Sequence, residues 1–183
     1  MHRRLAIASL ACWPAAHLLA QRDDRARHKV AAGELYEALA KRFPLRFGVP
    51  PLLDVQVSAA SLLLHPARNR LGAVLQAELV GPQGAQLPTG EMDIVFALRY
   101  EPSDRTLRAH DPQILDVRFP GMLPEAARTL QDLSPGLARR VGEVVVHRFT
   151  PRELALPDTM GLEPRELQVV DDGLVVFFGP KGG

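Results

Sequence analysis

The stretch "TGEMDIVFALRYEPSDRTLRAHDPQILDVRFPG", residues 89–121, decides the fold because large apolar residues recur at every second position. Five of them share one parity: Met92, Ile94, Phe96, Leu98 and Tyr100. A two-residue repeat places all five side chains on the same face of a strand, while Asp93 and Arg99 point the other way. An apolar cover must therefore lie over this face. It is either a helix of the protein itself or, in part, an apolar ligand.

Strands are also predicted on both sides of this segment. The turn "EPSDRT" leads into a strand over residues 107–119, and two strands precede the quoted stretch, over residues 52–66 and 71–81. The inward parity of the first changes near Ala59 and Ala60, which is typical of a β-bulge or bend. Four consecutive strands with short turns form an antiparallel meander, because parallel neighbours need crossovers of about a dozen residues or more.

Helices and a terminal hairpin complete the predicted fold. Residues 33–43 and 124–133 have helical patterns, and residues 134–149 predict a second helix that carries the stripe Leu137, Val141, Val144, Val145 and Phe149. The β-branched run at 144–146 leaves a strand as the alternative there. Residues 165–179 predict a hairpin that turns at Asp172 and Gly173. The fold class is α+β, with a strongly curved antiparallel sheet, the meander plus the hairpin, wrapped against one long and one or two short helices.

Composition indicates one globular domain without a nucleic-acid partner. The chain has 183 residues, 46% hydrophobic and 23% charged, which suits a single domain with its own core. Its formal net charge is +1, and no basic run is interleaved with aromatic residues. Nucleic acid is therefore not an expected partner.

The first 20 residues predict export. Arg3 and Arg4 precede an apolar stretch over residues 5–20, which is shorter than the roughly 20 apolar residues of a membrane-spanning helix and contains Pro14. The predicted organisation is a signal peptide over 1–20, a flexible segment over 21–32, one domain over 33–179 and a tail over 180–183. A periplasmic location follows. The alternative is a lipoprotein anchored through Cys12, although Ser9 stands where the lipoprotein cleavage motif has leucine.

The order of these segments resembles a known family. The stretches that carry the resemblance are "ELYEALAKRFP", "VPPLLDVQVSAASLLL", "GEMDIVFALRY", "MLPEAARTLQDLSPGLARRV" and "RELQVVDDGLVVFF". From about residue 33 to residue 178, the chain resembles the YceB-like family of bacterial envelope lipoproteins, a domain of unknown function. The resemblance implies a relationship to tubular, BPI-like lipid-binding proteins. In those proteins a curved sheet wraps a long helix and encloses an apolar groove for acyl chains.

Catalytic and metal-binding residues are not predicted. Beyond the N-terminal stretch, His28, His65, His110 and His147 are scattered without metal-ligand spacing, and no serine stands in a nucleophile-elbow motif. His147 follows three valines and is interpreted as a histidine at the core boundary. The sequence therefore predicts no enzyme, no metal and no cofactor.

The functional hypothesis concerns apolar surface. Burial of one large side chain stabilises a fold by about 1.5–3 kcal/mol, so core packing is the default role of any single apolar residue. If the helices do not cover the whole sheet, the uncovered face would bind a ligand. The predicted ligand-binding residues are Leu75, Leu79, Met92, Ile94, Phe96, Leu98, Tyr100, Leu137, Val141 and Val145.

Two main functions are weighed on this basis. The first is a non-catalytic periplasmic binding protein for lipid or another hydrophobic ligand, held in a groove between the curved sheet and the helix. The alternative is an envelope protein–protein interaction module with a fully packed core, and a hydrolase is a distant third. The expected partners are a hydrophobic small molecule or lipid, the membrane through an N-terminal anchor, and an envelope protein.

Overall fold

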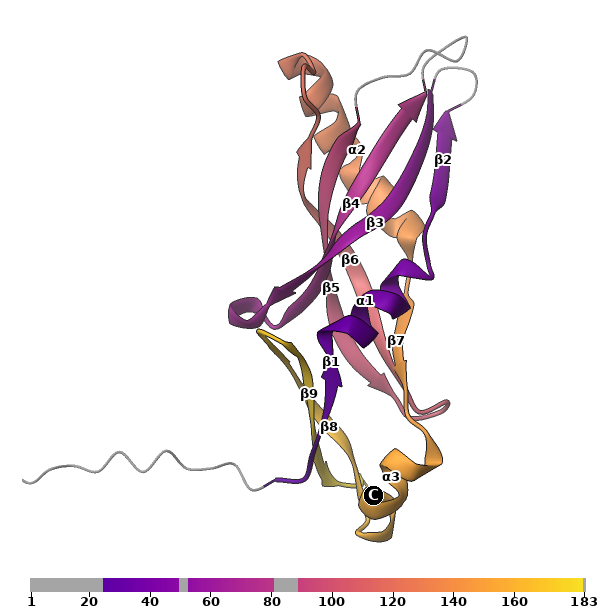
Figure 1. The fold of residues 1–183 in the computed structure, drawn as a ribbon, viewed down its shortest axis with the longest axis vertical. Coiled ribbons are helices and arrows are strands. Elements are labelled where there is room, and N and C mark those ends of the chain that lie inside the picture. The colour runs from indigo at the N-terminus through magenta and orange to yellow at the C-terminus, as the bar shows by residue number, and fades with distance from the viewer. Residues whose placement is uncertain (1–24, 50–52, 81–88, 183) are drawn as a thin grey trace, which may run out of the picture.

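The computed structural model describes residues 25–49, 53–80 and 89–182 (Figure 1). The predicted signal peptide and Cys12 lie outside these residues. The elements follow in the order β1 (Arg27–Ala31), α1 (Ala32–Ala40), β2 (Leu45–Val49), β3 (Leu53–His65), a short 3₁₀ turn (Pro66–Arg68), β4 (Arg70–Val80), β5 (Gly90–Glu101), β6 (Thr106–Arg118), α2 (Pro124–Val141), β7 (Val144–Arg148), α3 (Pro151–Thr159), β8 (Leu162–Val170) and β9 (Gly173–Pro180).

Two antiparallel sheets make up the molecule. The larger has the order β2-β3-β4-β5-β6-β7 and curls into a half-barrel, with the predicted meander at its centre. The smaller has the order β1-β9-β8 and contains the predicted C-terminal hairpin. The long helix α2 lies along β6, and the short helix α1 packs against β7 and β3 (Figure 1). The predicted α+β fold with a strongly curved antiparallel sheet is confirmed.

Strand parity and curvature follow the sequence pattern closely. On β5 the side chains of Ile94 and Phe96 are fully buried, and Met92 is nearly so. The register between β3 and β4 shifts between Ala59 and Ser61, where the sequence predicted a bulge. A bulge adds a residue to one strand only and increases local twist, so it helps to curl the half-barrel.

One hydrophobic core joins the two sheets. Val30, Leu174 and Val176 of the small sheet belong to the same buried cluster as Phe96 of β5 and Leu35 of α1. The hairpin β8–β9 therefore buries its apolar face against the rest of the molecule, since a lone hairpin is only marginally stable in water.

The predicted helix over residues 134–149 is helical only as far as Val141, and the alternative of a strand at 144–146 is correct. Helix α2 runs without interruption from Pro124 through Pro135 and ends at Val141. Gly142 follows with φ 68°, a left-handed conformation that glycine adopts without strain. The β-branched residues after it then form strand β7, because their restricted side chains fit a pleated sheet better than a helix. None of the helices among the described residues has the length and apolar character needed to span a membrane.

Three further elements differ from the predictions. Strand β1 lies within residues 21–32, which were predicted to be flexible, because pairing with β9 satisfies its backbone from Arg27 to Ala31. Strand β2, over Leu45–Val49, was not among the predicted strands. Helix α3 was not predicted, although Thr150 and Glu153 form a capping box at its start.

Candidate functional site

The predicted ligand-binding residues fall into three groups in the structure. The first is core, at most 5% exposed, and contains Leu75, Met92, Ile94, Phe96 and Val141. The second packs partly buried against the core and contains Leu98, Tyr100 and Leu137. The third is Val145 alone, which is 40% exposed. Leu79 belongs to β4, but its side chain lies outside the described residues.

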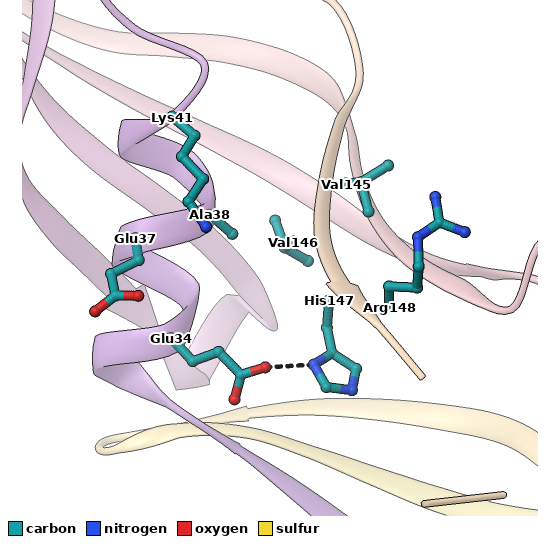
Figure 2. A pocket seen from close by; sticks show the side chains of 8 residues that line it. All are labelled: Glu34, Glu37, Ala38, Lys41, Val145, Val146, His147 and Arg148. Atoms are coloured by element: carbon teal, nitrogen blue, oxygen red, sulfur yellow. Dashed lines mark hydrogen bonds and ion pairs between the residues drawn. The ribbon is translucent and has the colours of Figure 1, made fainter. Parts of the chain in front are cut away.

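Val145 requires a correction. The sequence placed it on one helical stripe with Leu137 and Val141, but the helix ends before it and β7 turns its side chain outward. It lines a hollow of about 330 Å³ between α1 and β7, together with Glu34, Lys41 and others (Figure 2). The predicted stripe is therefore not one continuous wall.

A groove lies at the seam between β6 and α2, and none of the predicted ligand-binding residues is among its lining residues in the described part of the chain. Strand β7 pairs with β6 only from Thr106 to Ala109, so the edge of β6 beyond that point faces α2. The groove has a volume of about 360 Å³. Partly buried Ile114 and buried Ala138 contribute apolar surface to it. Exposed Asp111, Gln113 and Arg139 contribute an acidic, an amide and a basic group.

A second constellation lies where β1, β7 and α3 meet. Oε1 of Glu153 is 3.2 Å from Nε2 of His28 and 3.4 Å from Nε2 of His147. One ligand atom from each of these three residues lies within 4.8 Å of the others. The side chain of His147 is 5% exposed, whereas those of His28 and Glu153 are about a quarter exposed, at 27% and 25%.

A bulge in β7 aims His147 inward. His147 pairs with Leu107 and Val145 pairs with Arg108, which leaves Val146 without an opposite residue. Regular alternation would put His147 on the same exposed face as Val145. With the extra residue, Val146 and His147 are both buried. Bulges commonly redirect a side chain in this way beside functional sites.

Hydrogen bonds made by the carboxylates of Glu34 and Glu153 fix the geometry of this constellation. Oε1 of Glu34 on α1 is 2.5 Å from Nδ1 of His147 (Figure 2). Oε2 of Glu153 accepts hydrogen bonds from the backbone N–H and the hydroxyl of Thr150 at 2.6 and 2.7 Å, which leaves Oε1 to face the histidines. Burial raises the pKa of Glu153, but these bonds and the nearby imidazoles outweigh it and hold the pKa below its usual range.

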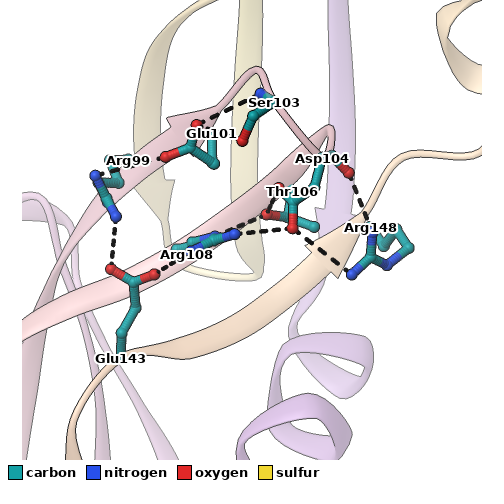
Figure 3. A network of polar contacts seen from close by, with 8 residues as sticks. All are labelled: Arg99, Glu101, Ser103, Asp104, Thr106, Arg108, Glu143 and Arg148. Atoms are coloured by element: carbon teal, nitrogen blue, oxygen red, sulfur yellow. Dashed lines mark hydrogen bonds and ion pairs between the residues drawn. The ribbon is translucent and has the colours of Figure 1, made fainter.

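Strand β7 is itself held in place by a polar network (Figure 3). Glu143, in the turn between α2 and β7, accepts hydrogen bonds from Arg99 at 2.8 Å and from Arg108 at 2.6 Å. Arg108 also donates to Asp104 at 2.8 Å, and Arg148 donates to the backbone carbonyl of Asp104 at 3.1 Å. The network therefore clamps both ends of β7 to the β5–β6 hairpin.

The sequence signals did not reveal the constellation at His147. Its members come from both ends of the chain and have no characteristic spacing, so only the pairing of β1 with β9 and the bulge in β7 bring them together. The Thr150–Glu153 capping box was the one local signal, and it would have placed Glu153 in the first turn of a helix.

Comparisons with known proteins do not assign the chain to a family. No protein-family model matches the chain, so the resemblance to the YceB-like family gains no support from them. No curated protein matches it. Among solved structures, a crystal structure of lipopolysaccharide binding protein is weakly similar, with a TM-score of 0.28 and 12% sequence identity. The similarity covers 86% of this chain but only 41% of that chain, and it is too weak to support a fold or functional assignment.

Proposed function

We propose that this domain is a non-catalytic binding protein for a lipid-class hydrophobic ligand, held in the groove between β6 and α2. The observation that carries the proposal is the groove itself, because its volume of about 360 Å³ lies within the range of roughly 300–1,000 Å³ typical of ligand pockets. Ile114 and Ala138 supply apolar contact, and Arg139 supplies a cation for an acidic headgroup. The composition of residues 1–20 supports export to the periplasm as part of the same proposal.

The burial of β5 moves the proposed site away from the residues first predicted. Phe96 and Ile94 are fully buried in the core, so a ligand could reach them only by displacing packed side chains. Such displacement disrupts close packing that is as dense as an organic crystal. The seam between sheet and helix offers volume without that cost, and Ala138 of α2 lines it.

The proposal is tested by binding of a fluorescent fatty acid to the purified protein. Ile114→Trp fills the groove, and we expect affinity to fall at least about tenfold, which corresponds to about 1.4 kcal/mol. Leu115→Trp is the matched control, because Leu115 is the next residue on β6 and is 41% exposed. Thermal unfolding of both variants establishes that they are folded. Equal binding by the wild type and both variants would place the ligand elsewhere.

Arg139→Gln tests the contribution of the ligand's headgroup to binding separately from that of its apolar tail. Loss of the cation should weaken a fatty acid but leave the matching fatty alcohol unchanged, because only the acid carries a carboxylate. The control is Arg128→Gln, at an exposed position of the same helix.

The interaction module remains a second candidate because two large apolar side chains are exposed on α3 and at its C-cap. Leu156 is 68% exposed and the C-cap residue Met160 is 60% exposed. They stand at positions i and i+4, so they lie on the same side of the helix end. Exposed apolar patches mark protein interfaces when they are contiguous. A wild-type protein that binds neither fatty acid nor alcohol would favour this second function.

A further inference from the structure

We propose that His28, His147 and Glu153 form a binding site for one divalent transition-metal ion of the zinc class. This inference is independent of the hydrophobic groove, which involves β6 and α2. None of these three residues lines that groove, so lipid binding there would not involve them.

The distances match a tetrahedral metal centre. Zinc binds imidazole nitrogen and carboxylate oxygen at about 2.0–2.1 Å, and a tetrahedron with such bonds has ligand–ligand edges of about 3.3–3.4 Å. The two edges that involve Glu153 Oε1 measure 3.2 Å and 3.4 Å. The third edge joins the two histidines, whose ligand atoms lie within 4.8 Å, so a modest rotation of His28 closes it.

His147 presents a buried ring nitrogen to the centre of the cluster. The carboxylate of Glu34 can only accept a hydrogen bond, so Nδ1 of His147 is the donor and Nε2 is the ring atom that faces the other two residues. This Nε2 is buried and has no hydrogen-bond partner within the described part of the chain. It lies 3.4 Å from Oε1 of Glu153. A cation bound by both atoms would give the buried nitrogen a partner.

Neighbouring residues orient His147 and Glu153 in the way that outer-shell residues orient metal ligands. A carboxylate on the far nitrogen of a ligand histidine fixes its tautomer and ring orientation, and Glu34 occupies this position. The capping bonds of Thr150 orient Glu153 in the same way. Phe149 covers the imidazoles edge-on, with ring centroids 4.8 Å from His147 and 5.5 Å from His28, and keeps that side apolar.

The ligand set selects the class of ion. Two imidazoles and one carboxylate suit zinc and its transition-metal neighbours, whereas calcium requires six to eight oxygen ligands. The partial exposure of His28 and Glu153 leaves the fourth position open to water. The ion would join β1 of the small sheet, β7 of the half-barrel and α3, so it would fasten the two sheets to each other.

Metal titration of the full chain tests the proposal. The protein is first treated with a chelator, and Zn²⁺ is then added in competition with a fluorescent zinc indicator at pH 7. We expect one ion per chain and a rise in melting temperature that depends on it, because binding to the folded state alone stabilises it. Cobalt provides a second readout, since tetrahedral coordination changes its visible spectrum.

Matched variants locate the site. His28→Gln and Glu153→Gln should each weaken zinc binding at least about tenfold and remove the rise in melting temperature, and glutamine at position 153 keeps the capping box. Glu34→Gln should weaken binding about tenfold without abolishing it. His110→Gln is the control, because His110 lies on β6 away from the cluster, and it should bind like the wild type.

Two results would overturn the inference. One is a wild type that takes up no zinc at pH 7, which would mean that a proton alone satisfies the buried nitrogen. The other is equal zinc affinity in the wild type, His28→Gln and Glu153→Gln, which would assign the ion to other residues.

Discussion

Asn69 shows how one residue can hold two sheets together. It follows the turn between β3 and β4 with φ 50°, a left-handed conformation that asparagine tolerates better than most residues. Its amide donates to the carbonyl of Leu167 at 2.7 Å and accepts from the N–H of Val169 at 2.7 Å. Both partners belong to β8, so the side chain ties the half-barrel to the small sheet.

Two substitutions of Asn69 separate the contribution of its hydrogen bonds from that of its left-handed backbone conformation. Asn69→Ala loses both hydrogen bonds and adds left-handed strain, and we expect it to lower the free energy of unfolding by about 2–4 kcal/mol. Asn69→Gly keeps the backbone conformation and should cost less. Urea denaturation measures both values, and an alanine variant as stable as the glycine variant would remove the backbone argument.

At the scale of residues, the sequence predicted which side chains are buried better than it predicted which polar side chains lie together. The alternation over Met92, Ile94 and Phe96 specified one buried face of β5, but Val95 on the opposite parity is buried as well, at 4% exposed. His147 was interpreted as a core-boundary histidine, and its burial agrees with that. Its carboxylate partners could not be predicted, because they depend on which elements meet in three dimensions.

At the scale of elements, the clamp around Glu143 makes stability depend on pH. The hydrogen bond from Arg108 is the main reason that the pKa of Glu143 lies below its ordinary value of 4.5. Asp104, bonded by Thr106 and Arg108, likewise has a lowered pKa. A carboxylate with a lowered folded-state pKa stabilises the fold above its ordinary pKa, and this contribution is lost as pH falls through the folded value.

Glu143→Gln should therefore flatten the loss of stability below about pH 4.5. At pH 7 the variant should be less stable than the wild type, and the two should converge as the pH approaches 3. The measurement is the urea midpoint at intervals from pH 7 to pH 3, with Glu125→Gln on α2 as the control. A constant difference between wild type and variant over this range would contradict the argument.

Element boundaries were harder to predict than element types. The stripe of Leu137 and Val141 extended in register through Val144, so periodicity alone favoured one helix. The helix stops at Gly142, and the β-branched residues after it form a strand because they can pair with the edge of β6. Edge pairing is a tertiary effect, and a local pattern does not contain it.

At the scale of the whole molecule, the shared core should make unfolding a single transition. Phe149 contacts Tyr100 of β5 and Phe178 of β9, with ring centroids 6.0 Å and 6.3 Å apart, so it bridges the sheets. Phe149→Ala should lower the free energy of unfolding by about 3–5 kcal/mol, and Phe149→Leu by less. Amide exchange on β9 and circular dichroism should report the same midpoint. Loss of β9 protection well before the half-barrel unfolds would show that the sheets are separate units.

The pairing of β1 with β9 also constrains how the protein is made. The ribosome synthesises β1 long before β9, so the nascent chain must keep β1 without its strand partner while everything between them is translated. The half-barrel is assembled mostly from sequence neighbours and is ready to close earlier, because nearby segments meet faster than distant ones. The small sheet is therefore the last part of the molecule to form.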